Sequence, residues 1–117
     1  HKHERDNVVY IGTHDNQTLK DWMQTQEQAV TDYATRYFHL DKKEGIQWGF
    51  IRGAMSSVAN LAIFQVQDLL YLGKEARMNQ PNTVSGNWTW RMHKEALTDT
   101  LAKKLKERTQ WFGRDTR

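Results

Sequence analysis

The residues best suited to chemistry are a histidine and an aspartate that stand side by side, His14 and Asp15. A short apolar run ends just before them, and a helical pattern begins just after. In α/β folds the C-terminal ends of strands are where ligands bind and catalysis takes place. An aspartate in this position is also typical of a helix N-cap. The sequence therefore leaves two interpretations of Asp15 open, a site carboxylate and a capping residue.

Two short apolar runs are predicted to form the strands that position this pair. They cover residues 8–12 and 61–68. Their nearly continuous apolar character is typical of strands buried on both faces of a parallel sheet. The second run turns polar at Gln67 and Asp68. Because parallel strands end at the same edge of a sheet, we expect these two side chains to lie near the His-Asp pair.

Helical periodicity fills the chain between the two strands and returns near its end. It predicts helices over about 18–39, 46–58 and 94–109, the first two forming a layer outside the sheet. In the second helix Gly49 and Gly53 stand four residues apart, which would allow a close contact with another helix or with the sheet. Strand, helices and strand in this order form a βαβ crossover, so the two strands should be parallel.

A long segment without regular periodicity, residues 71–92, follows the second strand. It is not of low complexity, and long loops of this kind are more often functional than idle. A short helical turn is expected at about 74–78. Arg77 could pair with a carboxylate or cross-link the loop to a strand end. Trp88 and Trp90 could stack on sugar rings, although tryptophans in such a segment more commonly anchor the loop in the core.

Length and composition restrict the classes of protein. The 117 residues make one ordinary domain, and no apolar run is long enough for a membrane helix, so no membrane association is expected. The net charge is +3, but basic and acidic residues are interleaved, and we do not expect nucleic-acid binding. The absence of cysteine excludes disulfides and thiolate metal sites and fits a cytoplasmic protein. His1, His3 and His14 lack a suitably spaced carboxylate, so neither a metal nor a cofactor is expected.

The two predicted strands raise a difficulty. A two-stranded parallel sheet that is apolar on both faces leaves open edges, which are prone to aggregation. A closed barrel of eight βα units needs about 250 residues. We therefore expect either that the chain is a fragment whose partner strands lie elsewhere, or that it self-associates through its strand edges.

Three segments together resemble the C-terminal part of the catalytic domain of the 4-α-glucanotransferases, the amylomaltases or disproportionating enzymes. They are VYIGTHDN at 9–16, QDLLYLG at 67–73, and EARMNQP at 75–81 continued by GNWTWR at 86–91. The resemblance implies an α/β fold in which residues 1–117 supply the last two βα units of a (β/α)₈ TIM barrel, incomplete on their own. The missing partner is then the N-terminal part of the same enzyme.

The resemblance also implies a reaction. Enzymes of the family transfer α-1,4-glucan segments, from maltooligosaccharides or from dextrins derived from starch or glycogen, to a glucose or maltooligosaccharide acceptor by retaining double displacement. Asp15 matches the carboxylate that stabilises the transition state, and His14 and Asn79 match substrate-binding residues. No cofactor is implied. The nucleophile and the acid/base belong to the missing part, so the isolated chain is expected to be inactive.

The chain departs from the family pattern at three positions. Ile11 stands where threonine is usual, Gln17 where aspartate is usual, and Asn82 where a glycine follows proline. Asparagine tolerates a left-handed backbone better than other non-glycine residues, so we expect the turn to be kept.

A function of another class remains open at this point. The five tryptophans and the open strand edges would also suit a non-catalytic, carbohydrate-binding or self-associating α/β module.

Overall fold

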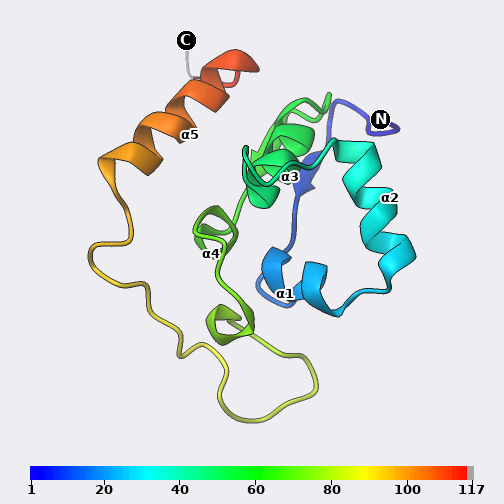
Figure 1. Ribbon diagram of the computed structural model, residues 1–117. Coiled ribbons are helices and arrows are strands. Elements are labelled where there is room, and N and C mark those ends of the chain that lie inside the picture. The colour runs from blue at the N-terminus through cyan, green and yellow to red at the C-terminus, as the bar shows by residue number, and fades with distance from the viewer. Residues whose placement is uncertain (116–117) are drawn as a thin grey trace.

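The computed structural model describes residues 1–115 and shows an α/β arrangement around a two-stranded sheet (Figure 1). The strands are parallel, and Val9 pairs with Ala62 at the centre of the register. The predicted βαβ crossover is therefore confirmed. In chain order the elements are β1 (Val8–Tyr10), α1 (Leu19–Thr25), α2 (Gln28–Phe38), α3 (Ile46–Met55), β2 (Leu61–Ile63), α4 (Val66–Leu69), the 3₁₀ turn η1 (Lys74–Ala76) and α5 (Asp99–Trp111).

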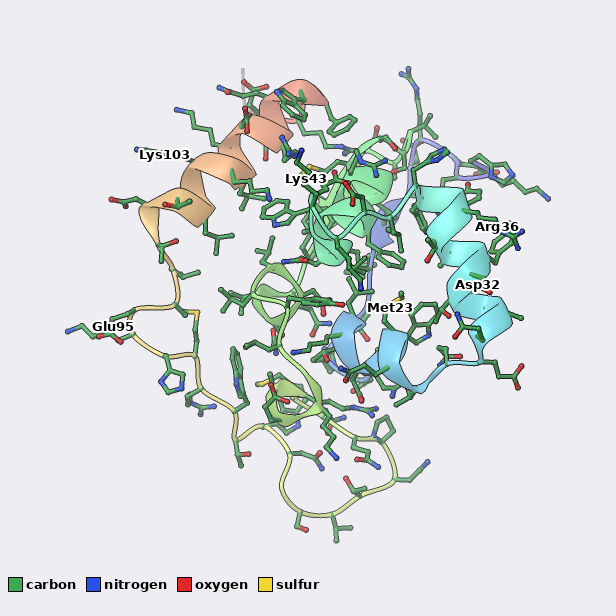
Figure 2. The ribbon with its side chains drawn as sticks, in the orientation of Figure 1. Met23, Asp32, Arg36, Lys43, Glu95 and Lys103 are labelled. Atoms are coloured by element: carbon green, nitrogen blue, oxygen red, sulfur yellow. The ribbon has the colours of Figure 1, made fainter. Side chains whose placement is uncertain are left out.

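The helix predicted over 18–39 is wrong as a single element. The chain forms α1 and α2 instead, because Gln26 and Glu27 between them adopt extended backbone angles with ψ of 157° and 145°. Neither glycine nor proline marks the break, so the apolar spacing runs through it. Figure 2 shows Asp32 and Arg36 on the outer side of α2, pointing away from the sheet.

The second strand is shorter than the predicted 61–68. β2 ends at Ile63, and α4 then carries Gln67 and Asp68 on a helical turn that begins after the extended Gln65. A short apolar run fits a strand or a buried helical turn equally well, which is why its pattern did not separate the two. The predicted turn near 74–78 is present as η1, and the last helix begins at Asp99, later than expected, after Thr98 caps it.

The core lies between α3 and the sheet. Val9 of β1 packs with Ala54 of α3 and with Ala59, and the partly buried Ile11 and Phe64 join this cluster. A second cluster on α3 is covered by α5, which the long connection brings back over the helix (Figure 1). Its buried members are Trp48, Ile51 and Met55, and the α5 end contributes Leu101, Leu105 and Phe112.

The two glycines of α3 mark a close contact, as predicted, but with the end of α2 and the residues after it. A Cβ added to Gly53 would lie 2.4 Å from the ring of Phe38, and one added to Gly49 would lie 2.5 Å from Leu40 Cδ2. Real Cβ atoms do not approach other atoms so closely. Glycine at both positions therefore lets α3 lie directly against the end of α2.

One side of the sheet is uncovered among residues 1–115. Val8, Tyr10, Leu61 and Ile63 are each 40–51% exposed, and only Val9 of β1 is buried. Register pairs Val8 with Leu61 and Tyr10 with Ile63, so the four side chains share one face. The prediction that both faces are buried is wrong for these residues, because no described segment packs on that face.

Candidate functional site

A tight turn after β1 displays the predicted pair. Thr13 donates from its amide and its hydroxyl to Asn16 Oδ1, at 2.8 and 3.0 Å, and the Asn16 amide donates back to the Thr13 carbonyl. His14 and Asp15 lie at the tip, where their side chains are 55% and 48% exposed and His14 Nε2 is 3.3 Å from Asp15 Oδ1. The capping residue of α1 is Thr18, whose hydroxyl accepts from the Asp21 amide. Asp15 is thus not the N-cap of this helix.

The third predicted site residue reaches the same point from a segment 64 positions along the chain. Asn79 Nδ2 donates to Asp15 Oδ1 at 2.7 Å, and the Asn79 amide donates to the His14 carbonyl at 3.0 Å. Within residues 1–115 no hydrogen bond engages Asp15 Oδ2, which leaves this oxygen free to accept from a ligand. The structure therefore brings His14, Asp15 and Asn79 together.

Arg77 links the two segments through their main chains. Its Nη2 donates to the Asp15 carbonyl at 2.7 Å and its Nε to the Asn79 carbonyl at 2.9 Å. Of the two roles considered for this arginine, the cross-link is the one observed. The guanidinium thus contacts the residue that bears the site carboxylate without pairing with the carboxylate itself.

Trp88 forms an aromatic wall beside His14. The two ring centroids are 5.1 Å apart with the planes tilted by 44°, and the Trp88 side chain is 53% exposed. The backbone of Trp88 is left-handed, with φ of 61°, and its amide donates to the Met78 carbonyl at 2.7 Å. Anchoring in the core is thus wrong for Trp88, whereas Trp90 is partly buried. Sequence patterns gave no signal for the contact with His14, because the left-handed backbone that directs the indole there is unusual for tryptophan.

The turn before Trp88 keeps the geometry expected from its composition. Asn82, which follows the proline and was expected to accept a left-handed backbone, has φ of 65°. Asn87 Oδ1 accepts from the Gln80 amide at 2.8 Å, and its Nδ2 donates to the Thr83 hydroxyl at 2.9 Å. These bonds close the loop on itself and hold Trp88 next to the site.

Gln67 and Asp68 form hydrogen bonds to the main chain of segments that flank the site. Gln67 Nε2 donates to the Ala76 carbonyl at 3.2 Å, directly before Arg77. Asp68 Oδ1 accepts from the Leu19 amide at 2.8 Å, at the first residue of α1. Within residues 1–115 neither side chain forms a hydrogen bond to His14 or Asp15, so the two side chains hold the segments that flank the site.

Asp68 is the most deeply buried carboxyl group of the site region, with 1% of the residue exposed. Burial raises its pKa above the ordinary value of 3.8, and the hydrogen bond from the Leu19 amide opposes this shift. The Gln65 side chain opposes the shift as well, but within residues 1–115 neither Gln65 Nε2 nor the second oxygen of Asp68, Oδ2, forms a hydrogen bond of good geometry. A buried acceptor of this kind is costly unless it is protonated or bonded.

No group of three histidine or acidic side chains within residues 1–115 is arranged to hold a metal ion. Nor does any helix in this range combine the length and the apolar character needed to cross a membrane. The side chains that the structure brings together at the site supply a carboxylate, an imidazole, an amide and an indole.

These groups lie beyond the C-terminal end of a parallel strand, which is where α/β proteins bind their ligands. The family model described as 4-alpha-glucanotransferase matches residues 1–98. The chain belongs to this family.

Individual relatives agree with the family match. A 4-alpha-glucanotransferase of Clostridium butyricum is 44% identical over 115 residues, which cover 97% of this chain and 24% of the relative. One from Synechocystis sp. is 47% identical over 107 residues, covering 92% of this chain and 21% of the relative. The chain thus spans about a quarter of the length of these relatives.

A solved structure has the same fold. The amylomaltase from Streptococcus agalactiae in complex with acarbose superposes with a TM-score of 0.93 at 36% sequence identity, over 97% of this chain and 23% of that one. The α/β arrangement described above is therefore that of a segment of an amylomaltase.

Proposed function

We propose that this chain supplies the last two βα units of the (β/α)₈ barrel of a longer 4-α-glucanotransferase. The parallel strand pair and the match to a quarter of the relatives' length support this assignment. The exposed apolar face made by Val8, Tyr10, Leu61 and Ile63 supports it too, because strands of a closed barrel bury such side chains against neighbouring strands and helices. The earlier part of the same enzyme is then the partner that covers this face.

The proposed reaction moves an α-1,4-glucan segment from a maltooligosaccharide, or from a dextrin derived from starch or glycogen, to a glucose or maltooligosaccharide acceptor. In the first step a carboxylate nucleophile attacks C1, the glycosidic bond breaks, and an acid protonates the leaving oxygen. In the second step the acceptor hydroxyl attacks C1, and the residue that served as the acid now takes the hydroxyl's proton as a base. The nucleophile is released, and the product keeps the anomeric configuration of the donor. Both of these carboxylates would come from the earlier part of the enzyme. No step requires a cofactor.

Asp15 is the residue of this chain that would stabilise the transition state. Positive charge develops on C1 and the ring oxygen of the sugar, and a fixed carboxylate that accepts hydrogen bonds from sugar hydroxyls favours the distorted, charged ring. The observation that carries the proposal is that the two carboxylate oxygens of Asp15 differ in their hydrogen bonding. Asn79 holds Oδ1 at 2.7 Å, while Oδ2 stays available to a ligand.

His14 and Asn79 would bind the same sugar. The exposed imidazole of His14 can donate to a hydroxyl without serving as an acid catalyst. Asn79 uses one N–H on Asp15, so its amide oxygen and its second N–H remain for substrate. Together with Asp15 they can contact several hydroxyl groups of one glucose unit, which suits a polyhydroxylated substrate.

Asp15→Asn in the full-length enzyme tests this role. We expect kcat for disproportionation of maltotriose to fall by about 10²–10³-fold, the range for loss of one preorganised electrostatic group. The matched control is Asp32→Asn, an exposed aspartate on the outer side of α2, which should leave kcat unchanged (Figure 2). Near-normal turnover of the Asp15 variant would contradict the proposal.

The exposed sheet face also favours a second candidate, a self-associating module that binds carbohydrate without catalysis. Calorimetric titration of the 117-residue chain with a maltooligosaccharide separates the two. Tight, saturable binding by the chain alone supports the module, whereas the glucanotransferase proposal expects no tight binding by about a quarter of an enzyme. Light scattering of the same sample measures whether copies pair through the face.

A cytoplasmic location also remains a prediction. The relative from Solanum tuberosum is named chloroplastic/amyloplastic, so the location differs among members of the family. Cell fractionation with an antibody against the chain tests it.

A further inference from the structure

We infer that Arg77 is a positioning residue that sets where the Asp15 carboxylate lies, an inference that rests on the proposed function. Arg77 makes no hydrogen bond to the carboxylate and is not expected to touch substrate. It acts through the main chain, where it binds the carbonyl of Asp15 at 2.7 Å and the carbonyl of Asn79 at 2.9 Å. One guanidinium thus fixes both the residue that carries the carboxylate and the residue that holds its Oδ1.

The geometry suits arginine and not lysine. The two bonds leave from different nitrogens, Nη2 and Nε, and they diverge to two carbonyls, one in the turn after β1 and one in the loop that carries Arg77 itself. A guanidinium presents its N–H groups in a rigid planar fork, whereas a lysine ammonium is a single point on a flexible stem. Replacement by lysine can keep one of the two bonds but not the fixed angle between them.

Beside the ring contact of Trp88 with His14, Asn79 adds two further hydrogen bonds between the two segments. The Asn79 amide donates to the His14 carbonyl at 3.0 Å, and Asn79 Nδ2 donates to Asp15 Oδ1 at 2.7 Å. Residues 80–86 are all exposed, so they contribute little buried apolar surface that would hold the loop in place. Hydrogen bonds therefore decide the position of this loop. Those from the Arg77 guanidinium and the one that the Asp15 carboxylate accepts from Asn79 are charge-assisted.

The peptide group of Asp15 orients its side chain. The Asp15 carbonyl carbon is bonded to the Cα that bears the side chain, so a displacement of this carbonyl shifts the Cα, and the exposed carboxylate moves with it. Misplacement of a catalytic group by about 1 Å can cost about 10²-fold in rate. Removal of the bond to the Asp15 carbonyl should therefore act on the rate more than on substrate affinity.

The test measures kcat and KM for disproportionation of maltotriose by the full-length enzyme with Arg77→Ala or Arg77→Lys. The matched control is Arg91→Ala. Arg91 lies in the same loop and also donates to two carbonyls, those of Trp88 and Trp90, but to none in residues 11–18. We expect kcat of Arg77→Ala to fall by about 10²-fold with KM within about twofold of wild type, and Arg91→Ala to keep both values.

A rescue measurement separates positioning from a merely structural role. Ethylguanidinium at millimolar concentration should restore part of kcat to Arg77→Ala, and none to Asp15→Asn. Arg77→Lys should retain more activity than Arg77→Ala and less than wild type. A kcat of Arg77→Ala within twofold of the Arg91 control, or a loss that appears only in KM, overturns the inference.

A crystal structure of the Arg77→Ala enzyme gives a readout that does not depend on activity. We expect the Asp15 carboxylate to shift by about 1 Å or more from its wild-type place, and an unmoved carboxylate overturns the inference. If wild-type enzyme fails to disproportionate maltotriose, the proposed function fails, and this structural measurement still decides the role of Arg77.

Discussion

Two contacts between distant segments are built in opposite ways. Where α5 covers α3, Leu101, Leu105 and Phe112 pack on a buried apolar cluster. Where the loop after η1 meets the turn after β1, three hydrogen bonds made by Arg77 and Asn79 join the two segments around an exposed carboxylate, and the Trp88 ring lies beside His14. The first contact removes apolar surface from water, and the second fixes the direction of polar groups.

The two contacts serve different properties, the first the stability of the fold and the second the placement of site residues. Apolar burial is large and non-directional, so it stabilises the fold without fixing a side chain to a fraction of an ångström. Hydrogen bonds contribute less net stability but depend strongly on distance and angle. Substitutions in the first contact should thus lower stability with activity retained, and substitutions in the second should do the reverse, as expected for Asp15 and Arg77.

The largest effect on stability is expected at Ile51, which is completely buried between Trp48 and Met55. In the full-length enzyme Ile51→Ala should lower the free energy of unfolding by about 2–5 kcal/mol, and Ile51→Val by about 0.5–1.5 kcal/mol, because a cavity replaces the lost methyl groups. Denaturant titration measures both. The control Val84→Ala alters a fully exposed side chain and should stay within about 0.5 kcal/mol. An Ile51→Ala enzyme that keeps its stability but loses kcat would contradict the comparison.

Asp68 combines features of the two contacts, since it is buried like the apolar cluster on α3 and polar like the candidate site. Asp68→Leu leaves the Leu19 amide without its acceptor and should cost about 1–3 kcal/mol. Asp68→Asn keeps an acceptor of the same shape and should cost less. Unfolding of the full-length enzyme by denaturant, at neutral pH, measures the difference between the two variants.

The same carboxyl group gives a pH dependence with a definite sign. Burial raises its folded-state pKa above the unfolded value, so the folded state binds the proton more tightly. Its contribution to stability is then full below about pH 4 and is lost as the pH rises through the folded-state pKa. The stability of Asp68→Asn relative to wild type should therefore increase from about pH 4 upward. A difference that stays flat with pH would show that Asp68 titrates as it does in the unfolded chain.

The smallest effect is expected at Trp88, where two substitutions should differ in stability but not in activity. Left-handed backbone favours glycine, so Trp88→Gly should be more stable than Trp88→Ala by about 1 kcal/mol. Both variants lose the ring beside His14, and both should show the same, modest fall in kcat/KM for maltotriose. A larger fall for one of them would indicate that the backbone, and not the indole, supports His14.

Prediction from sequence succeeded where the signal is local or topological. The order strand, helices, strand correctly predicted parallel strands, and the spacing of the two glycines in α3 correctly predicted a close contact with another helix. It failed at Gln26 and Glu27, where extended backbone interrupts a helical pattern without a residue that favours a break. It also extended the second strand across Gln67 and Asp68, because an apolar run does not reveal whether its residues are helical.

In the candidate site, too, some features could be predicted from the sequence and others could not. His14 and Asp15 could be singled out from their residue types at a strand end, and Asn79 only from the family resemblance. The bond between Asn79 and Asp15, the cross-link by Arg77 and the contact of Trp88 with His14 join segments more than 60 residues apart. Such bonds require distances near 3 Å and fixed angles, which no pattern along the chain encodes.

The sequence by itself determined that a histidine and an aspartate follow a strand and precede a helix. It also predicted two parallel strands, and from them the need for partners beyond this sheet, which stays a prediction. Tertiary structure alone decided what Asp15 does there. Thr18 caps α1, Asn79 binds Oδ1, and Oδ2 has no hydrogen-bond partner within residues 1–115. The physical reason is that residue type fixes which bonds a side chain can make, whereas only the packing of distant segments decides which of them it makes.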